Sequence, residues 1–502
     1  MQKIGWSLVS HSWFLTLTDT MTNTSEKKAL PEPSVSALEA APTQTADWVI
    51  REFAQAQLPD ERLHRRLEMI VSAFAQKPTA SIPQACANWG EAKGAYRFLE
   101  NERVVARDLR QAHHLATLDR VKEHAVVLAI QDTTALNYSS HPKTQGLGLL
   151  GSHSPKTIGL WPHSTVALTP KGEPLGWLHN AIGVRQPQGV GRPRKKPKES
   201  IRWVESLQAT QELAPQCPQT LLVNVADREG DFYELFEQAL KVRGVGQVHL
   251  LVRAYQDRRL ANSQGTLWPE VGRQPVAASL ALRVGRKGDQ PSRMTRLNIR
   301  FCPVELQAPW GKAGHPIKLW AIEASESVPV PKGSAPILWR LLTSLPVVEA
   351  AQALEKVQWY AQRWQIEVWH KVLKSGCQIE QRQLETAQRL ERVLSLDLVV
   401  AWRVLCLCQR AREMPEDPVS HWLPQAQWQA LCCYAQRQTT PPQNAPSVRQ
   451  AVRWLAQMGG FLGRKCDGEP GPQTLWRGLH KLEAITEMWR LFQEKERSQK
   501  CG

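Results

Sequence analysis

Two apolar runs, each ending in an aspartate, most constrain how this chain can fold. The first run covers residues 124–131 and ends at Asp132, and the second covers residues 220–226 and ends at Asp227. Continuous β-branched runs of this length are typical of strands that are buried on both faces of a sheet. Functional side chains gather at the C-terminal ends of such strands. The two runs therefore predict an α/β fold with an acid at each of two strand ends.

A charged helix is predicted across residues 359–374. At about 100° per residue, four of its polar side chains fall within roughly 60° of one another: Tyr360, Arg363, Glu367 and Lys374. The apolar residues between them indicate that the helix packs against protein. A single helical Glu is more often the partner in a structural ion pair than a catalytic residue. The two strand-end acids favour the catalytic interpretation here.

Three carboxylates on two strand ends and one helix suit a pair of divalent metal ions. Mg²⁺ prefers hard oxygen ligands and keeps water and substrate phosphate in its shell. Paired ions stabilise the attacking and leaving oxygens of an in-line displacement at phosphorus. Asp132, Asp227 and Glu367 are therefore the predicted catalytic residues and metal ligands, with Mg²⁺ as the cofactor and Mn²⁺ as its substitute. Asp227 also fits a plain helix N-cap, a role that Asp231 could fill equally well.

A known family shares the order and spacing of these residues. The chain resembles the bacterial insertion-sequence-four group of cut-and-paste DDE transposases in the set Asp132-Thr-Thr, Asp227-Arg-Glu-Gly-Asp and Tyr360-x2-Arg363-x3-Glu367-x6-Lys374. The spacing of the tyrosine, arginine, glutamate and lysine is the specific part of the resemblance. Residues 46–99 resemble the family's N-terminal DNA-recognition region, and residues 459–478 resemble its C-terminal segment.

The resemblance implies a DNA transposase. Such an enzyme binds the terminal inverted repeats of an insertion sequence, cleaves the ends through a hairpin intermediate and carries out strand transfer. The resemblance also places Trp339 where an indole stacks on a base flipped from the DNA, although the residue fits a plain core position as well. It assigns contacts with DNA phosphates to Tyr360, Arg363 and Lys374, with Arg228 and Arg253 as weaker candidates.

The chain divides into four predicted regions. Their order follows from helical periodicity near the ends and from a strand, hairpin, helix and strand between the two aspartates, which is the ribonuclease-H-like order. A basic loop at 189–198 could follow DNA phosphates or merely keep the chain soluble, and Met21 could be the true start. The regions are a disordered extension at 1–45, a helical DNA-end recognition domain at 46–118, a ribonuclease-H-like mixed-sheet catalytic core at 119–420 with a β-rich insertion at about 255–345, and a helical C-terminal dimerisation region at 421–502.

The net charge indicates the class of partner. A formal charge of +16 favours a polyanion and supplies sequence-independent affinity for DNA. The predicted partners are the double-stranded DNA of the transposon ends and target and, by resemblance, a second copy of the chain in the synaptic complex. No apolar run reaches transmembrane length, so no membrane is expected. The 10 cysteines lack the spacing of a zinc site, which favours reduced thiols and a cytoplasmic location.

Two other functions fit part of this pattern. A DNA-binding repressor derived from a transposase would keep the fold without catalysis. The loss of one acid would favour this function, but all three acids are present in this sequence. A structure-specific nuclease of the same fold would have no need of the N-terminal and C-terminal segments. The transposase is therefore the preferred interpretation.

Overall fold

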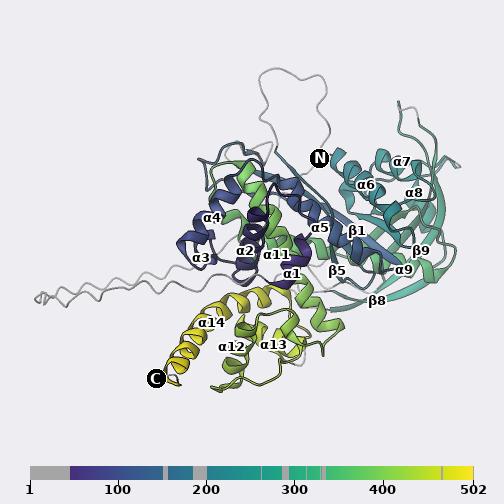
Figure 1. Ribbon diagram of the computed structural model, residues 1–502. Helices are drawn as coiled ribbons and strands as arrows, with labels where there is room; N and C mark the ends of the chain where they lie inside the picture. The colour runs from purple at the N-terminus through teal and green to yellow at the C-terminus, as the bar shows by residue number, and fades with distance from the viewer. Residues whose placement is uncertain are drawn as a thin grey trace, which may run out of the picture. The chain divides into compact units, whose positions relative to one another are not determined.

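The computed structural model shows how the predicted strands and helices are arranged (Figure 1). The extension predicted at residues 1–45 and the basic loop at 189–198 lie outside the residues that it describes. The described residues are 46–150, 157–184, 200–261, 263–284, 293–311, 314–327, 330, 335–464 and 467–500.

One mixed sheet contains both of the predicted acid-bearing strands. β1 runs parallel to β6 and β6 runs parallel to β7, whereas β4 is antiparallel to β1 and to β5. Two further strands, β3 (Gly148–Leu149) and β5 (Pro174–Gly183), also pair with β4. In the described part of the chain the sheet has 11 strands, and its main path is β2 (Leu136–Asn137), β4 (Ile158–Leu168), β1 (Val126–Thr133), β6 (Leu221–Ala226), β7 (His249–Arg253), β11 (Leu338–Thr343), β10 (Ile317–Glu326), β9 (Arg293–Leu306) and β8 (Ala278–Val284).

The central strands are buried on both faces, as the apolar runs predict. Val127 and Ala129 of β1 belong to one hydrophobic core, Leu128 and Ile130 belong to the other, and all four are fully buried. This alternation follows from the period of two in a strand. The crossover helices α6 (Ile201–Leu213) and α7 (Tyr233–Lys241) pack in the first core, and α9 (Ala350–Ala361), α10 (Trp364–Lys371) and α11 (Ala387–Glu413) pack in the second.

The predicted β-rich insertion extends this same sheet. β11 pairs antiparallel with β7, so that Leu341 lies opposite Arg253, and β10, β9 and β8 follow in turn. Buried and exposed side chains mostly alternate along β9. That pattern is typical of an antiparallel strand with one face against the core and the other toward water. The short helix α8 (Leu267–Gly272) packs against β9 and β10.

The N-terminal region is helical, as predicted. Asp60 caps the second helix, because its side chain accepts a hydrogen bond from the Leu63 N–H at 3.0 Å. In Figure 1 the helices α2, α4 and α5 lie beside α11, and the structure places all three in contact with it. The region comprises α1 (Asp47–Phe53), α2 (Glu61–Gln76), α3 (Ile82–Ala85), α4 (Trp89–Glu100) and α5 (Ala106–Val121).

A buried polar network attaches these helices to the sheet. Glu52 of α1 pairs with His113 and Arg120 of α5, and Arg120 Nε donates to the Leu175 carbonyl of β5 at 2.6 Å. His113 Nε2 accepts the Trp177 N–H at 3.2 Å, so the ring is neutral and donates from Nδ1 to Glu52. Burial raises the pKa of Glu52, but the opposing effects of His113 and Arg120 are larger together and lower the pKa to about 2. The glutamate therefore stays charged at neutral pH.

The helix predicted across residues 359–374 is interrupted, which corrects the single-stripe interpretation. After α9 the backbone tightens, because the Gln362 and Arg363 N–H groups bond three residues back, and α10 begins at Trp364. At its other end α10 widens into a π-turn at Val372–Gly376, which contains Lys374. The polar residues are therefore distributed over two helices and a turn. Turns of this π type are frequent at functional sites.

The C-terminal region is also helical. The long helix α11 is buried along most of its length, and it is followed by α12 (Gln425–Gln436), α13 (Val448–Met458) and α14 (Pro472–Lys500). All eight cysteines in the described ranges are free thiols, and seven of them are buried. Among the described helices, none is long and apolar enough to cross a membrane.

Candidate active site

Asp132 and Asp227 lie at neighbouring strand ends. β1 and β6 are parallel, and their register places Ile130 opposite Val225. Asp132 and Asp227 each come two residues later, so they lie at the same end of the two strands. The carboxyl ends of parallel strands meet at one edge for this topological reason. Asp227 accepts the Glu229 N–H at 2.8 Å, so its side chain also caps the short turn that follows β6.

Negative charge gathers around Asp132. Burial raises the pKa of this carboxyl, and Asp227 and Glu367 raise it further. Arg363 and a hydrogen bond from the Thr133 N–H at 2.8 Å act in the opposite direction, and the resulting pKa is about 7. The three predicted acids are therefore close enough to interact. A proton or a cation beside Asp132 would relieve their mutual repulsion.

Arg363 stands between two of these acids. One of its guanidinium nitrogens, Nη1, lies 3.8 Å from Asp132 Oδ2, and Nη2 pairs with Glu367 Oε1. The Glu367 side chain is 58% exposed, so it faces the open side of the site. Within the described residues, no three His, Cys, Asp or Glu side chains are grouped closely enough to hold a metal ion. Arg363 therefore contacts two of the three predicted acids and neutralises part of their charge.

One side of the site consists of two aromatic residues and an arginine: Tyr360, Trp339 and Arg253. The Tyr360 side chain is buried and hydrogen bonds to Arg253, and its ring lies edge-on to that of Trp339 with the centroids 5.5 Å apart. Arg253 Nη2 also donates to the Leu338 carbonyl at 3.2 Å. Tyr360 therefore supports Arg253 and Trp339, and these two side chains are more exposed than Tyr360 itself.

Lys374 and Arg228 provide the remaining predicted cations. Burial lowers the pKa of Lys374, while Glu380 and Asp132 raise it, which places the ammonium group near the acids. Arg228 follows Asp227 directly and is exposed, and its guanidinium carbon lies 5.9 Å from the centre of the Tyr255 ring. Lys374 therefore lies near Asp132, whereas Arg228 follows Asp227 in the chain and lies beside Tyr255.

Two residues near the site, His370 and Tyr255, were not predicted, and a third, Asp231, was predicted only as a possible helix cap, a role that it does not have in α7. His370 Nδ1 lies 4.0 Å from Asp132 Oδ2, its Nε2 is buried without a hydrogen-bond partner, and burial and nearby cations lower its pKa to about 3. Its position three residues after Glu367 could have indicated it. Tyr255 and the buried Asp231 are brought to the site by β7 and the turn after β6. No local sequence pattern relates these two residues.

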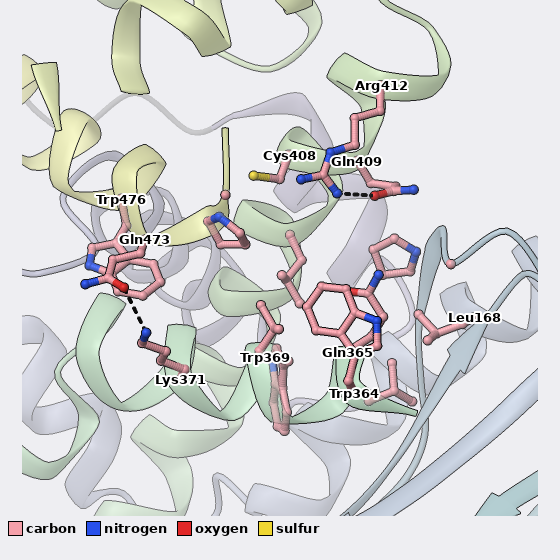
Figure 2. Close-up of a pocket in the computed structure, with 17 residues that line it drawn as sticks. Leu168, Trp364, Gln365, Trp369, Lys371, Cys408, Gln409, Arg412, Gln473 and Trp476 are labelled. Carbon is pink, nitrogen blue, oxygen red and sulfur yellow. Dashed lines mark hydrogen bonds between the residues drawn. The ribbon is translucent and has the colours of Figure 1, made fainter. Parts of the chain in front are cut away.

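A cavity lies on a different face of α10 (Figure 2). It measures about 250 Å³ and is lined by residues of α10, α11, α14 and the β4–β5 hairpin, including Trp364, Trp369 and Trp476. At its margin, Lys371 Nζ donates to Gln473 Oε1 at 2.8 Å and connects α10 with α14. None of the three predicted acids lines this cavity. It is therefore separate from the candidate active site.

Comparisons with known proteins identify the two ends of the chain. Residues 45–104 match the family model described as transposase DNA-binding, and residues 399–497 match the transposase Tn5 dimerisation domain. Both ends are similar to transposase segments. These matches support a DNA transposase related to the Tn5 type, with a DNA-binding and a dimerisation region. The three predicted acids lie between the two matched segments.

Among solved structures, the chain is similar to a piggyBac transposase synaptic complex with hairpin DNA. The sequence identity is 10%, the alignment covers 84% of this chain and 79% of that one, and the TM-score is 0.34.

Proposed function

We propose that this protein is a DNA transposase that binds the terminal inverted repeats of an insertion sequence, cleaves the ends with divalent metal and carries out strand transfer. One observation carries the proposal: Asp132 and Asp227 end neighbouring parallel strands beside Glu367, between segments that match transposase DNA-binding and dimerisation regions. The function requires such a site together with the means to hold two DNA ends. We also propose that the protein is of bacterial origin and that its catalytic motif is of the DDE type.

The strand order supports a ribonuclease-H-like core. β5, β4, β1, β6 and β7 lie in this order across the sheet, with the first three antiparallel and the last three parallel. α6 connects β5 to β6, and α7 connects β6 to β7. The arrangement places the ends of β1 and β6 at the centre of the sheet. A DNA strand at these ends would have cations on either side.

The donor set fits a hard divalent cation. Carboxylate oxygens are the ligands that Mg²⁺ prefers, and Mn²⁺ accepts the same ligands. Burial is the main cause of the raised pKa of Asp132, and the negative charge of Asp227 and Glu367, which a cation would neutralise, raises it further. Asp132, Asp227 and Glu367 would hold the ions once Arg363 releases Glu367 and the three carboxylates move closer together than they lie in this structure. When bound, the ions would stabilise charge on the attacking and leaving oxygens at phosphorus.

The chain's own cations would orient the DNA. Lys374 and Arg253 provide donors for phosphate oxygens beside the acids, and Arg363 could transfer from Glu367 to a phosphate. In the first step water attacks phosphorus, the bond to the 3′ oxygen breaks, and a 3′-OH and a 5′-phosphate remain. The freed 3′-OH then attacks a phosphorus of the opposite strand, the bond from that phosphorus to the 3′ oxygen of the flanking DNA breaks, and a hairpin closes as the flanking 3′-OH leaves. Opening of that hairpin precedes strand transfer.

A plasmid assay tests this function against its two alternatives. The substrate is supercoiled plasmid that carries the DNA flanking the gene, including its inverted repeats, and the matched control carries scrambled repeats. With Mg²⁺ we expect excision of the segment between intact repeats and no excision from the control. Binding to the repeats without cleavage would indicate a silent repressor. Equal nicking of both plasmids would indicate a structure-specific nuclease.

Replacing Lys374 with Ala is expected to reduce the salt dependence of DNA binding. Each lost phosphate contact lowers the slope of log K against log salt concentration by about 0.9. Arg363→Ala should weaken complex assembly and lower the slope by a similar amount. Lys241→Ala removes a charge from a surface pair on α7 and is the matched control. Unchanged slopes for both site variants would mean that Lys374 and Arg363 act only as structural ion pairs.

Replacing Trp339 with Ala is expected to impair hairpin formation more than the first nick. Only the second step needs a displaced base, and stacking on an aromatic ring contributes about 1–3 kcal/mol. Hairpin yield should therefore fall about 10-fold while nicking persists. Nicking, hairpin yield and melting temperature are measured on one preparation. Equal loss of both steps with a lowered melting temperature would instead show that the indole acts through its packing on Tyr360.

A further inference from the structure

We propose that Tyr255 and Arg228 form a binding platform for an unpaired nucleotide at the rim of the active site, where the Tyr255 ring stacks on the base and Arg228 binds its phosphate. The inference rests on the proposed function and adds a DNA contact to it. It begins from an exposed aromatic residue: Tyr255 is 73% exposed, two residues after the end of the buried strand β7.

The sheet places this ring beside the acids. Ala226 of β6 lies opposite Val252 of β7, so Asp227 and Arg228 leave the sheet next to Arg253 and the residues after it. The Arg228 guanidinium carbon is 5.9 Å from the centre of the Tyr255 ring, which is within the range of a cation–π contact. An aromatic face with a guanidinium beside it is the combination that binds single-stranded nucleic acid.

The Tyr255 backbone is held rigidly. The Asp231 side chain is fully buried, and its Oδ2 accepts the N–H groups of Tyr255 at 2.6 Å and Gln256 at 2.9 Å. Its Oδ1 pairs with Arg258 Nη1 at 2.5 Å. One carboxylate therefore fixes the segment after β7 to the turn that carries Arg228. An exposed ring on a fixed backbone loses little conformational entropy when it binds a ligand.

The neighbouring strand adds a second ring in line with the first. Leu341 lies opposite Arg253, and the Ala254 N–H donates to the Arg340 carbonyl at 2.7 Å, so the antiparallel ladder continues beyond β7. In this register the next position places Tyr255 opposite Trp339. Directly opposed residues share one face of a sheet. Trp339 packs on Tyr360 and is half-buried, whereas Tyr255 leaves most of its ring free for a base.

The test compares two DNA probes without divalent metal. One is a short duplex with a single-stranded thymine tail that contains a fluorescent aminopurine, and the other is the same duplex with blunt ends. We expect Tyr255→Ala to weaken binding of the tailed duplex about 10-fold, in proportion to one lost stacking contact. Binding of the blunt duplex should be unchanged, and the quenching of the aminopurine should decrease. Tyr255→Phe keeps the ring and should behave like the unsubstituted protein.

Controls separate this inference from the proposed function. Tyr434→Ala removes another exposed tyrosine, on α12, and should change neither affinity. If Tyr255→Ala binds both probes as the unsubstituted protein does, or if it loses affinity for both equally, the platform is refuted while DNA binding stands. A loss in Tyr255→Phe equal to that in Tyr255→Ala refutes stacking as well. If the unsubstituted protein binds neither probe, both the platform and the proposed function fail.

Discussion

Replacing Asp227 with Asn, or Glu367 with Gln, is expected to reduce DNA cleavage about 1,000-fold or more. Each change removes one charged oxygen ligand, and ions that stabilise charge at phosphorus contribute several kcal/mol to such a reaction. Binding to the DNA ends should persist, because the phosphate contacts come from cations elsewhere. The measurement is nicking of supercoiled plasmid beside end binding on the same preparation.

A matched substitution controls for the loss of negative charge. Glu355→Gln changes a half-exposed glutamate on α9 and should leave cleavage unaffected. Nicking by Glu367→Gln near the rate of the unsubstituted protein would exclude Glu367 from the site. Cleavage that survives in Asp227→Asn would likewise reduce this residue to a cap of the turn after β6.

Asp132→Asn should abolish cleavage as well, and it offers a second measurement that does not depend on activity. The pKa of Asp132 is about 7 in the folded protein, above its ordinary value of 3.8. The folded state thus binds more protons than the unfolded state between these values, so stability falls as pH rises through that window. At higher pH Asp132→Asn should therefore melt above the unsubstituted protein. Mg²⁺ should raise the melting temperature of the unsubstituted protein but not that of the variant.

Replacing Asp397 with Ala is expected to lower the free energy of unfolding by about 3–5 kcal/mol, because it leaves a buried guanidinium without its partner. Arg382 binds Asp397 through two hydrogen bonds of 3.1 and 2.9 Å, and both side chains are almost fully buried. Arg382 also donates to the Ala80 carbonyl at 2.8 Å and lies 4.4 Å from the centre of the Phe74 ring. The pair therefore joins α11 to the N-terminal helices. Denaturant unfolding of the purified protein measures the loss.

Two comparisons isolate the contribution of this pair. Arg382→Met with Asp397→Leu removes both charges, and the double variant should recover much of the stability lost in Asp397→Ala. Glu385→Ala breaks an exposed pair with Arg389 and should cost less than about 1 kcal/mol. A loss in Asp397→Ala as small as that in Glu385→Ala would contradict a structural role for the buried pair. The double variant also tests whether Arg382 makes a net contribution through Ala80 and Phe74.

The sequence alone determined the elements that depend on local pattern. The apolar runs before Asp132 and Asp227 predicted two strands buried on both faces, because period and length are local properties of the chain. The helical ends followed in the same way from periodicity. The spacing of Arg363 and Glu367 also indicated contact, since residues four apart are neighbours on a helix.

The tertiary structure decided what depends on register and on distant partners. Hydrogen bonds at Arg363 tightened the backbone and divided the predicted helix into two. The polar side chains expected on one face of a single helix are therefore distributed over separate elements. Pairing of β11 with β7 extended the sheet and placed Leu341 opposite Arg253, while Asp231 bound the backbone N–H of Tyr255. These residues are far apart in the chain, and the hydrophobic pattern of a strand specifies which face is buried but not which strand it will pair with. The acids and several of the surrounding cations were therefore visible in the sequence, and folding decided how the residues from distant parts of the chain lie around them.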